Sequence, residues 1–221
     1  MKRSEQQSNL YRSFCESEGS QHIASEYAID KINGLAKKFR VKRILEIGLG
    51  IGSISGIVLA LNRNKPDFDY IGTEANDFCL GALPENLKED YSRLKIYSDL
   101  SDIPSDKKFD LIIIDGKDQN LQAIKGLISV NGILAIEGDR MPQQDSLQEL
   151  FSDHKYVHCI SSLKNNSYSP FQATHWQGGL KIIFINPTSS QKLWWVREKI
   201  STKLKYWFRK RDKNQETINK T

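Results

Sequence analysis

The 221-residue chain has no long apolar run and few cysteines. No segment approaches the roughly 18 consecutive apolar residues of a membrane span, and the first residues, MKRSEQQSNLYRSF, lack the apolar core of a secretory signal. Cys15, Cys79 and Cys159 are far apart and odd in number, so they indicate neither a disulfide framework nor metal-ligand spacing. We therefore expect a cytoplasmic protein.

A basic surface is also missing from most of the chain. The net charge is +5, but residues 192–213 alone contain nine Lys or Arg against two acids, which leaves about −2 for the remainder. The main body therefore has no basic groove for nucleic acid. Hydrophobic residues at 38% and charged residues at 27% are ordinary for a folded soluble domain, and the length suits a single one.

Strand and helix patterns alternate along the chain. Helices are predicted over 53–64, over 78–90 with a break at Pro84, over 119–129, and from an N-cap-like Asp145 to 154. Strands are predicted over 41–48, 68–75, 94–99, 109–116, 133–138, 156–163 and 179–186. The last two strands have no helix between them, which favours an antiparallel pair at the sheet edge.

This order predicts an α/β protein with a Rossmann-like open sheet of seven strands, mostly parallel, with helices on both faces. We expect N-terminal cap helices over 1–40, a ligand-binding domain over 41–187 and a basic amphipathic helix over 188–221. Ligands bind such sheets outside the carboxyl ends of the strands. Five predicted strands carry an acid there, which indicates a site: Glu46, Glu74, Asp99, Asp115, and Glu137 with Asp139.

The first strand runs into a glycine turn, EIGLGIG, with Gly48, Gly50 and Gly52 at alternate positions. A dinucleotide fingerprint would be G-x-G-x-x-G, and Ser53 stands where its third glycine belongs. Glycines still allow a sharp turn and a close backbone approach to a ligand. Glu74 ends the second strand, where an acid can accept both hydroxyls of a ribose. Together these features favour an adenosyl ligand, and a tight structural turn is the alternative.

Several segments resemble the class I S-adenosylmethionine-dependent methyltransferases. LEIGLGIG resembles their first motif, YIGTEAN their acidic second-strand motif, and SD at 98–99 falls where they contact adenine. FDLIIIDG and VNGILAIEGDR are similar to their fourth- and fifth-strand motifs, with Asn131 in place of a glycine. The resemblance covers roughly residues 20 to 186. It implies S-adenosylmethionine as cofactor, with these cofactor-binding residues: Glu46, Gly48, Gly50, Gly52, Ser53, Glu74, Asp99 and Asp115.

IDGKD and IEGDRMP resemble the small-molecule O-methyltransferases of the catechol, caffeoyl-CoA and cephalosporin-biosynthesis type. That resemblance implies a Mg²⁺ ion held by Asp115, Glu137 and Asp139, because hard carboxylate oxygens suit this ion. Gly138 separates two acids that are neighbours in those enzymes. The alternative is that these acids only cap strand ends or helices.

The loop SYSPFQATHWQGG lies between the last two strands and contains His175. With a near-neutral pKa, a histidine there could act as general base for a hydroxyl, so His175 is one predicted catalytic residue. Asp115, at the end of the fourth strand, is the other. The alternative for His175 is an ordinary polar loop residue.

The C-terminal segment has apolar residues at 193, 196, 200, 204, 207 and 208, which share one face of a helix, with Lys and Arg on the other side. This pattern is typical of a helix at the surface of a membrane, here the inner face. The alternatives are packing on the protein's own core and a homodimer interface.

The sequence thus predicts a methyltransferase acting on a hydroxyl of a small molecule or saccharide, without a nucleic-acid partner. Alternatives are an N-methyltransferase, an aminopropyltransferase-like enzyme and a non-catalytic interaction module with the same fold.

Overall fold

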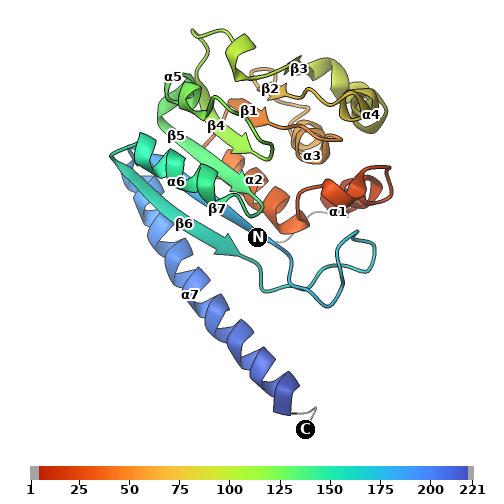
Figure 1. Ribbon diagram of the computed structural model, residues 1–221, viewed down its shortest axis with the longest axis vertical. Coiled ribbons are helices and arrows are strands. Elements are labelled where there is room, and N and C mark those ends of the chain that lie inside the picture. The colour runs from red at the N-terminus through yellow and green to blue at the C-terminus, as the bar shows by residue number, and fades with distance from the viewer. Residues whose placement is uncertain (1–4, 219–221) are drawn as a thin grey trace.

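The computed structural model describes residues 5–218, in which seven strands form one sheet in the order β3-β2-β1-β4-β5-β7-β6 (Figure 1). β7 runs antiparallel to both of its neighbours, and all other neighbouring strands are parallel. The strands are β1 Arg43–Ile47, β2 Asp69–Thr73, β3 Leu94–Tyr97, β4 Phe109–Ile114, β5 Ile128–Glu137, β6 His154–Ile160 and β7 Gly179–Ile185. The predicted fold class is confirmed, including the antiparallel pair at the edge.

Helices cover both faces of the sheet. The α-helices are α1 Glu5–Cys15, α2 Glu26–Lys38, α3 Ser53–Leu61, α4 Asp77–Leu87, α5 Ile124–Leu127, α6 Met141–Leu150 and α7 Ser189–Ile218. Short 3₁₀ turns lie at η1 Ser20–His22, η2 Lys88–Arg93, η3 Leu100–Asp102 and η4 Leu121–Ala123. One apolar cluster joins the sheet to α1 through α4 and to Trp194 and Trp195 of α7, and a second lies under α5 and α6.

The central strand β4 shows why the sheet is covered twice. Ile113 belongs to the first cluster, while Ile112 and Ile114 belong to the second, and all three are fully buried. Successive side chains of a strand point to opposite faces, so a continuous apolar run requires a layer on each side.

Three predictions about helices were wrong. The helix expected over 119–129 is reduced to η4 and α5, and β5 begins already at Ile128, where β-branched residues favour a strand. Helix α4 continues through Pro84 without the predicted break. Helix α6 begins at Met141, because Pro142 suits a first turn, so Asp145 lies inside the helix and is not its N-cap.

The terminal segments pack on the sheet. Residues of α1 and α2 belong to the first apolar cluster, and α7 lies along β6 (Figure 1). Within residues 5–218, none of the helices combines the length and the apolar character needed to cross a bilayer.

Candidate functional site

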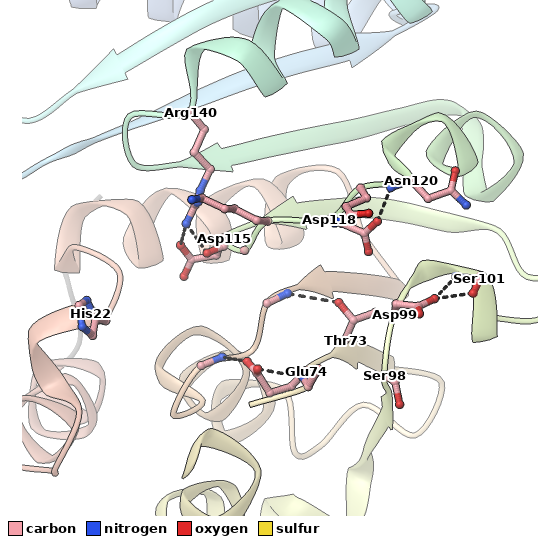
Figure 2. A pocket seen from close by; sticks show the side chains of 16 residues that line it. His22, Thr73, Glu74, Ser98, Asp99, Ser101, Asp115, Asp118, Asn120 and Arg140 are labelled. Carbon is pink, nitrogen blue, oxygen red and sulfur yellow. Dashed lines mark hydrogen bonds and ion pairs between the residues drawn. The ribbon is translucent and has the colours of Figure 1, made fainter. Parts of the chain in front are cut away.

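A cavity of about 720 Å³ opens at the carboxyl ends of the parallel strands (Figure 2). Its volume is typical of a small-molecule site. The cavity is lined by residues at or just after the ends of β1, β2, β3, β4 and β5, together with one residue from η1: His22, Gly48, Gly50, Thr73, Glu74, Ala75, Ser98, Asp99, Ser101, Asp115, Gly116, Lys117, Asp118, Gln119, Asn120 and Arg140.

The turn after β1 is built from glycine because its backbone is left-handed. Gly48 has φ +83° and Gly50 has φ +53°, in a region that favours glycine. The N–H of Gly48 donates to the carbonyl oxygen of Thr73 at 3.1 Å, which ties the turn to β2. A Cβ placed on Gly50 would meet no protein atom within 4 Å, so that part of the turn faces open space.

Glu74 is held rigidly at the end of β2. Its Oε2 accepts from the N–H of Gly50 at 2.7 Å, and its Oε1 accepts from the N–H groups of Ala75 and Asn76, each at 2.9 Å. Figure 2 shows the carboxylate turned toward the glycine turn. Because a carboxylate offers about four acceptor positions, Glu74 can still accept from a ligand hydroxyl.

Asp99 and Ser98 line the cavity beyond β3. Asp99 Oδ1 accepts from both the backbone N–H and the hydroxyl of Ser101 at 2.6 Å, and these bonds lower the pKa of Asp99. This part of the cavity therefore carries an ionised carboxylate next to small polar groups.

The turns after β1 and β4 touch through their backbones. A Cβ on Gly48 would lie 2.4 Å from Cα of Gly116, and a Cβ on Gly116 would lie 2.7 Å from Cα of Gly48. Real side chains do not tolerate such distances, so both positions require glycine. This contact fixes the distance between the glycine turn and the residues that follow β4.

Asp115 lies at the end of β4 beside a cation. The Arg140 guanidinium donates to the Asp115 backbone carbonyl and, at 3.3 Å, to its carboxylate (Figure 2). It also donates to the carbonyl of Glu137 at 2.9 Å. Burial raises the pKa of Asp115 well above its usual range, the Glu137 carboxylate raises it further, and Arg140 opposes both. Burial also raises the pKa of Glu137, against a hydrogen bond from the N–H of Ser25.

The predicted metal site at Asp115, Glu137 and Asp139 is not supported. The Asp139 side chain is 93% exposed and forms an ion pair with Lys181 at 3.7 Å. The described part of the chain contains no group of three or more His, Cys, Asp or Glu placed to hold a metal ion. A side-chain cation, Arg140, occupies the position beside Asp115.

Five of the eight predicted cofactor-binding residues line the cavity: Gly48, Gly50, Glu74, Asp99 and Asp115. The other three, Glu46, Gly52 and Ser53, do not line the cavity. Ser53 is buried in the first turn of α3, and a Cβ on Gly52 would meet the side chains of Leu83 and Leu87.

Glu46 is fully buried, and its Oε2 accepts from the hydroxyl of Tyr70 at 2.6 Å, while Oε1 has no partner among the described residues. Burial raises its pKa well above the usual range. Glu46 is therefore a buried residue of β1 next to the glycine turn and not part of the cavity wall.

His175 lies apart from this cavity. Its side chain is exposed in the loop between β6 and β7, and it is absent from the cavity lining. Its backbone N–H donates to Gln172 and its carbonyl accepts from Asn165, each at 3.0 Å, so its backbone helps to order the loop. The position of His175 gives no support to a catalytic role.

Among the lining residues that sequence reasoning missed are His22 and Arg140. His22 lies in η1, within the segment where N-terminal cap helices were expected, but its residue type alone carried no signal. Arg140 directly follows Asp139 in the sequence. It was overlooked because the metal prediction considered only the acids Glu137 and Asp139 in this segment. A basic residue at a strand end among several acids was the available signal.

No protein-family model matches this sequence, and no curated protein matches it. Solved structures do match in fold. The O-methyltransferase TomG from Streptomyces achromogenes, in complex with S-adenosylmethionine, is 15% identical with a TM-score of 0.60, covering 83% of this chain and 91% of that one. The O-methyltransferase from Bacillus cereus, in complex with S-adenosylhomocysteine, is 12% identical with a TM-score of 0.61, covering 83% and 92%. The S-adenosylhomocysteine-bound methyltransferase PaMTH1 from Podospora anserina is 16% identical with a TM-score of 0.54, covering 82% and 88%.

This chain therefore has the fold of the class I S-adenosylmethionine-dependent methyltransferases, a fold that O-methyltransferases share. The similarity extends over most of the chain.

Proposed function

We propose that this protein is an S-adenosylmethionine-dependent methyltransferase that methylates a hydroxyl oxygen of a small molecule or saccharide. One observation carries the proposal. Glu74 is fixed by three backbone N–H groups at the end of β2, next to a glycine turn, in a cavity of suitable size. An acid with one acceptor position left at this place suits a hydroxyl of a ribose, and the fold is that of the methyltransferases.

The residues present fit such a cofactor. Gly50 leaves open space beside the turn, which a side chain would fill. Ser98 and Asp99 offer polar contacts at the far end of the cavity, where a purine base would lie. In this proposal Glu74 holds the ribose, the backbone at Gly48 and Gly50 lies along the methionine portion, and Asp99 lies near the base.

When bound, S-adenosylmethionine supplies a methyl group on a positively charged sulfur. Transfer of that group is a displacement in which the protein chiefly contributes positioning and management of a proton. The acceptor hydroxyl must lose its proton as its oxygen forms the new bond to carbon, and the carbon–sulfur bond breaks with its electron pair remaining on sulfur.

Asp115 is the residue we propose to accept that proton. Its carboxyl lines the cavity, and its side chain is only 15% exposed. A pKa raised by burial and by Glu137 makes this carboxyl a stronger base than an exposed one. Arg140 then orients the carboxyl through its hydrogen bonds and adds positive charge where the acceptor oxygen becomes anionic.

Calorimetric titration with S-adenosylhomocysteine tests the proposal, with NADH as the competing adenosyl ligand. We expect S-adenosylhomocysteine to bind and NADH not to bind. Mass spectrometry of hydroxylated aromatic and sugar acceptors, incubated with the protein and S-adenosylmethionine, then detects a gain of one methyl group. Failure to bind S-adenosylhomocysteine would overturn the proposal, and binding without transfer to any acceptor would favour a non-catalytic module.

A further inference from the structure

Helix α7 uses only one of its faces to pack on the domain. Trp194 stacks edge-on against Phe184, with ring centroids 5.5 Å apart, and Trp195 Nε1 donates to the carbonyl of Tyr156 at 2.7 Å. Further along, Thr202 and Lys205 donate to backbone carbonyls at the end of β6. Packing on the protein's own core, one of the alternatives for this segment, therefore accounts for this inner face.

The predicted apolar stripe lies on the opposite face and stays uncovered. Its side chains are between 44% and 74% exposed: Leu193, Val196, Ile200, Leu204, Trp207 and Phe208. Their spacing of three and four residues places them along one side of the helix. Figure 1 shows α7 at the outer edge of the sheet, continuing past the end of β6. A contiguous apolar face of this length indicates a binding surface.

The charges beside this stripe are all positive. Between residues 189 and 211 the exposed ionisable lysines and arginines are Lys192, Arg197, Lys199, Lys203, Lys210 and Arg211. The one acid in that stretch, Glu198, lies on the inner face and pairs with Lys31 at 2.7 Å. The outer face therefore combines apolar side chains with uncompensated positive charge.

We propose that the outer face of α7 binds the surface of an anionic lipid bilayer, with the helix lying in the plane of the interface. Apolar side chains such as Leu204 and Phe208 enter the boundary between headgroups and acyl chains, and the flanking lysines and arginines meet lipid phosphates. Trp207 has the amphipathic ring that favours this boundary. A second copy of the chain is a poorer partner, because two such faces would bring the exposed lysines and arginines of residues 189–211 together.

A groove beside the stripe adds to the same surface. It measures about 470 Å³ and lies between α7 and the loop after β6, with Ile200, Leu204 and Phe208 forming its apolar part and Arg197 and Arg209 its basic part. The Arg209 guanidinium also lies 5.0 Å from the ring centroid of Trp176. Arg209 Nη2 also donates to the carbonyls of Ser161 and Gln177. Apolar side chains next to the guanidinium of Arg197 suit one lipid, whose chain and phosphate need these two environments.

Sedimentation of the full chain with vesicles tests the proposal, using phosphatidylcholine alone and phosphatidylcholine mixed with phosphatidylglycerol. We expect partition onto the mixed vesicles to exceed that onto the neutral ones by about tenfold or more, and to weaken as salt is added. The double variant Ile200→Glu, Leu204→Glu should lower partition onto mixed vesicles by about tenfold or more. Val130→Glu introduces an acid at another exposed apolar residue and should bind as the wild type does.

Circular dichroism and thermal unfolding should show that each variant is folded, because the replaced side chains are exposed. Three results would overturn the proposal. The first is that the wild type fails to sediment with mixed vesicles, and the second is that the double variant sediments as well as the wild type. The third is that light scattering finds a dimer for the wild type and a monomer for the double variant. The last result would make the face an interface between copies. Vesicle binding needs neither cofactor nor acceptor, so its outcome is independent of the proposed methyl transfer.

Discussion

The Arg140 guanidinium lies against the carboxylate of Asp115, with 3.3 Å between Nη2 and Oδ1, and also binds the backbone carbonyl of the same residue. The acids around this point resemble a magnesium site in sequence, yet the nearest positive charge belongs to the chain itself. A guanidinium in this place satisfies the buried carboxyl without an ion.

This arrangement predicts how the protein responds to Mg²⁺. In the wild type we expect millimolar Mg²⁺ to leave the unfolding temperature unchanged, because Arg140 already occupies the position beside Asp115. In Arg140→Ala, the carboxyls of Asp115 and Glu137 lose that cation, and Mg²⁺ should raise the unfolding temperature by about 2 °C or more. Arg43→Ala, which removes an exposed cation elsewhere, is the control. A Mg²⁺-dependent rise in the wild type would contradict this reading of Arg140.

Replacement of Glu74 should specifically weaken binding of the cofactor. Glu74→Ala removes a charged acceptor and leaves the N–H of Gly50 without its bond, so we expect affinity for S-adenosylhomocysteine to fall by about ten- to a hundredfold in calorimetric titration. Glu85→Ala removes an exposed acid from α4 and should bind like the wild type. Equal affinity in all three proteins would show that Glu74 does not contact the ligand.

The backbone contact between Gly48 and Gly116 gives a third prediction. Gly116→Ala places a methyl group 2.7 Å from a backbone atom that cannot move freely, so we expect a loss of about 1–3 kcal/mol in the free energy of unfolding, together with weaker cofactor binding. Denaturant unfolding of Gly81→Ala provides the contrast. A Cβ there meets nothing within 4 Å inside α4, and the free energy of unfolding should rise by about 0.5–1 kcal/mol. If Gly116→Ala leaves the free energy of unfolding unchanged, the two turns are not in contact.

Glu46 should make stability depend on pH. Burial raises its pKa above 4.5, the value of an ordinary glutamate, so the folded protein keeps a proton that the unfolded chain releases. The contribution of Glu46 to the free energy of unfolding therefore falls as pH rises from about 4.5 through the raised pKa. Glu46→Gln removes this dependence, and its stability relative to the wild type should increase with pH over that window.

Chemical denaturation at several pH values between 4.5 and 8 measures this effect. Glu85→Gln, at an exposed position, should track the wild type at every pH. A difference between Glu46→Gln and wild type that stays constant across the range would assign an ordinary pKa to Glu46.

The sheet and its ligand edge could be predicted from sequence because they depend on local patterns. The apolar run Ile112–Ile114 requires two covered faces, and the glycines after β1 require an unusual backbone. Glu74, Asp99 and Asp115 follow from the rule that parallel strands present their ends together, and all three line the cavity.

Side-chain direction is what the sequence could not supply. Glu46 and Asp139 both lie near strand ends, but Glu46 is fully buried and Asp139 points to solvent. His175 is in the expected loop and still lies outside the cavity. The helical periodicity of the C-terminal segment correctly grouped its apolar residues, but which face the domain covers depends on Trp194 and Trp195, whose partners are distant in sequence.

The contact between Gly48 and Gly116 also bears on how such a protein diversifies. It locks the turn beside the proposed donor to the strand end beside the proposed acceptor, so neither can shift to suit a new substrate. We therefore expect changes in acceptor preference to arise at other parts of the cavity lining, among them His22 in η1 and the segment that carries Arg140. Recombination or random mutagenesis restricted to those two segments should change which acceptor is methylated, while binding of the cofactor stays the same.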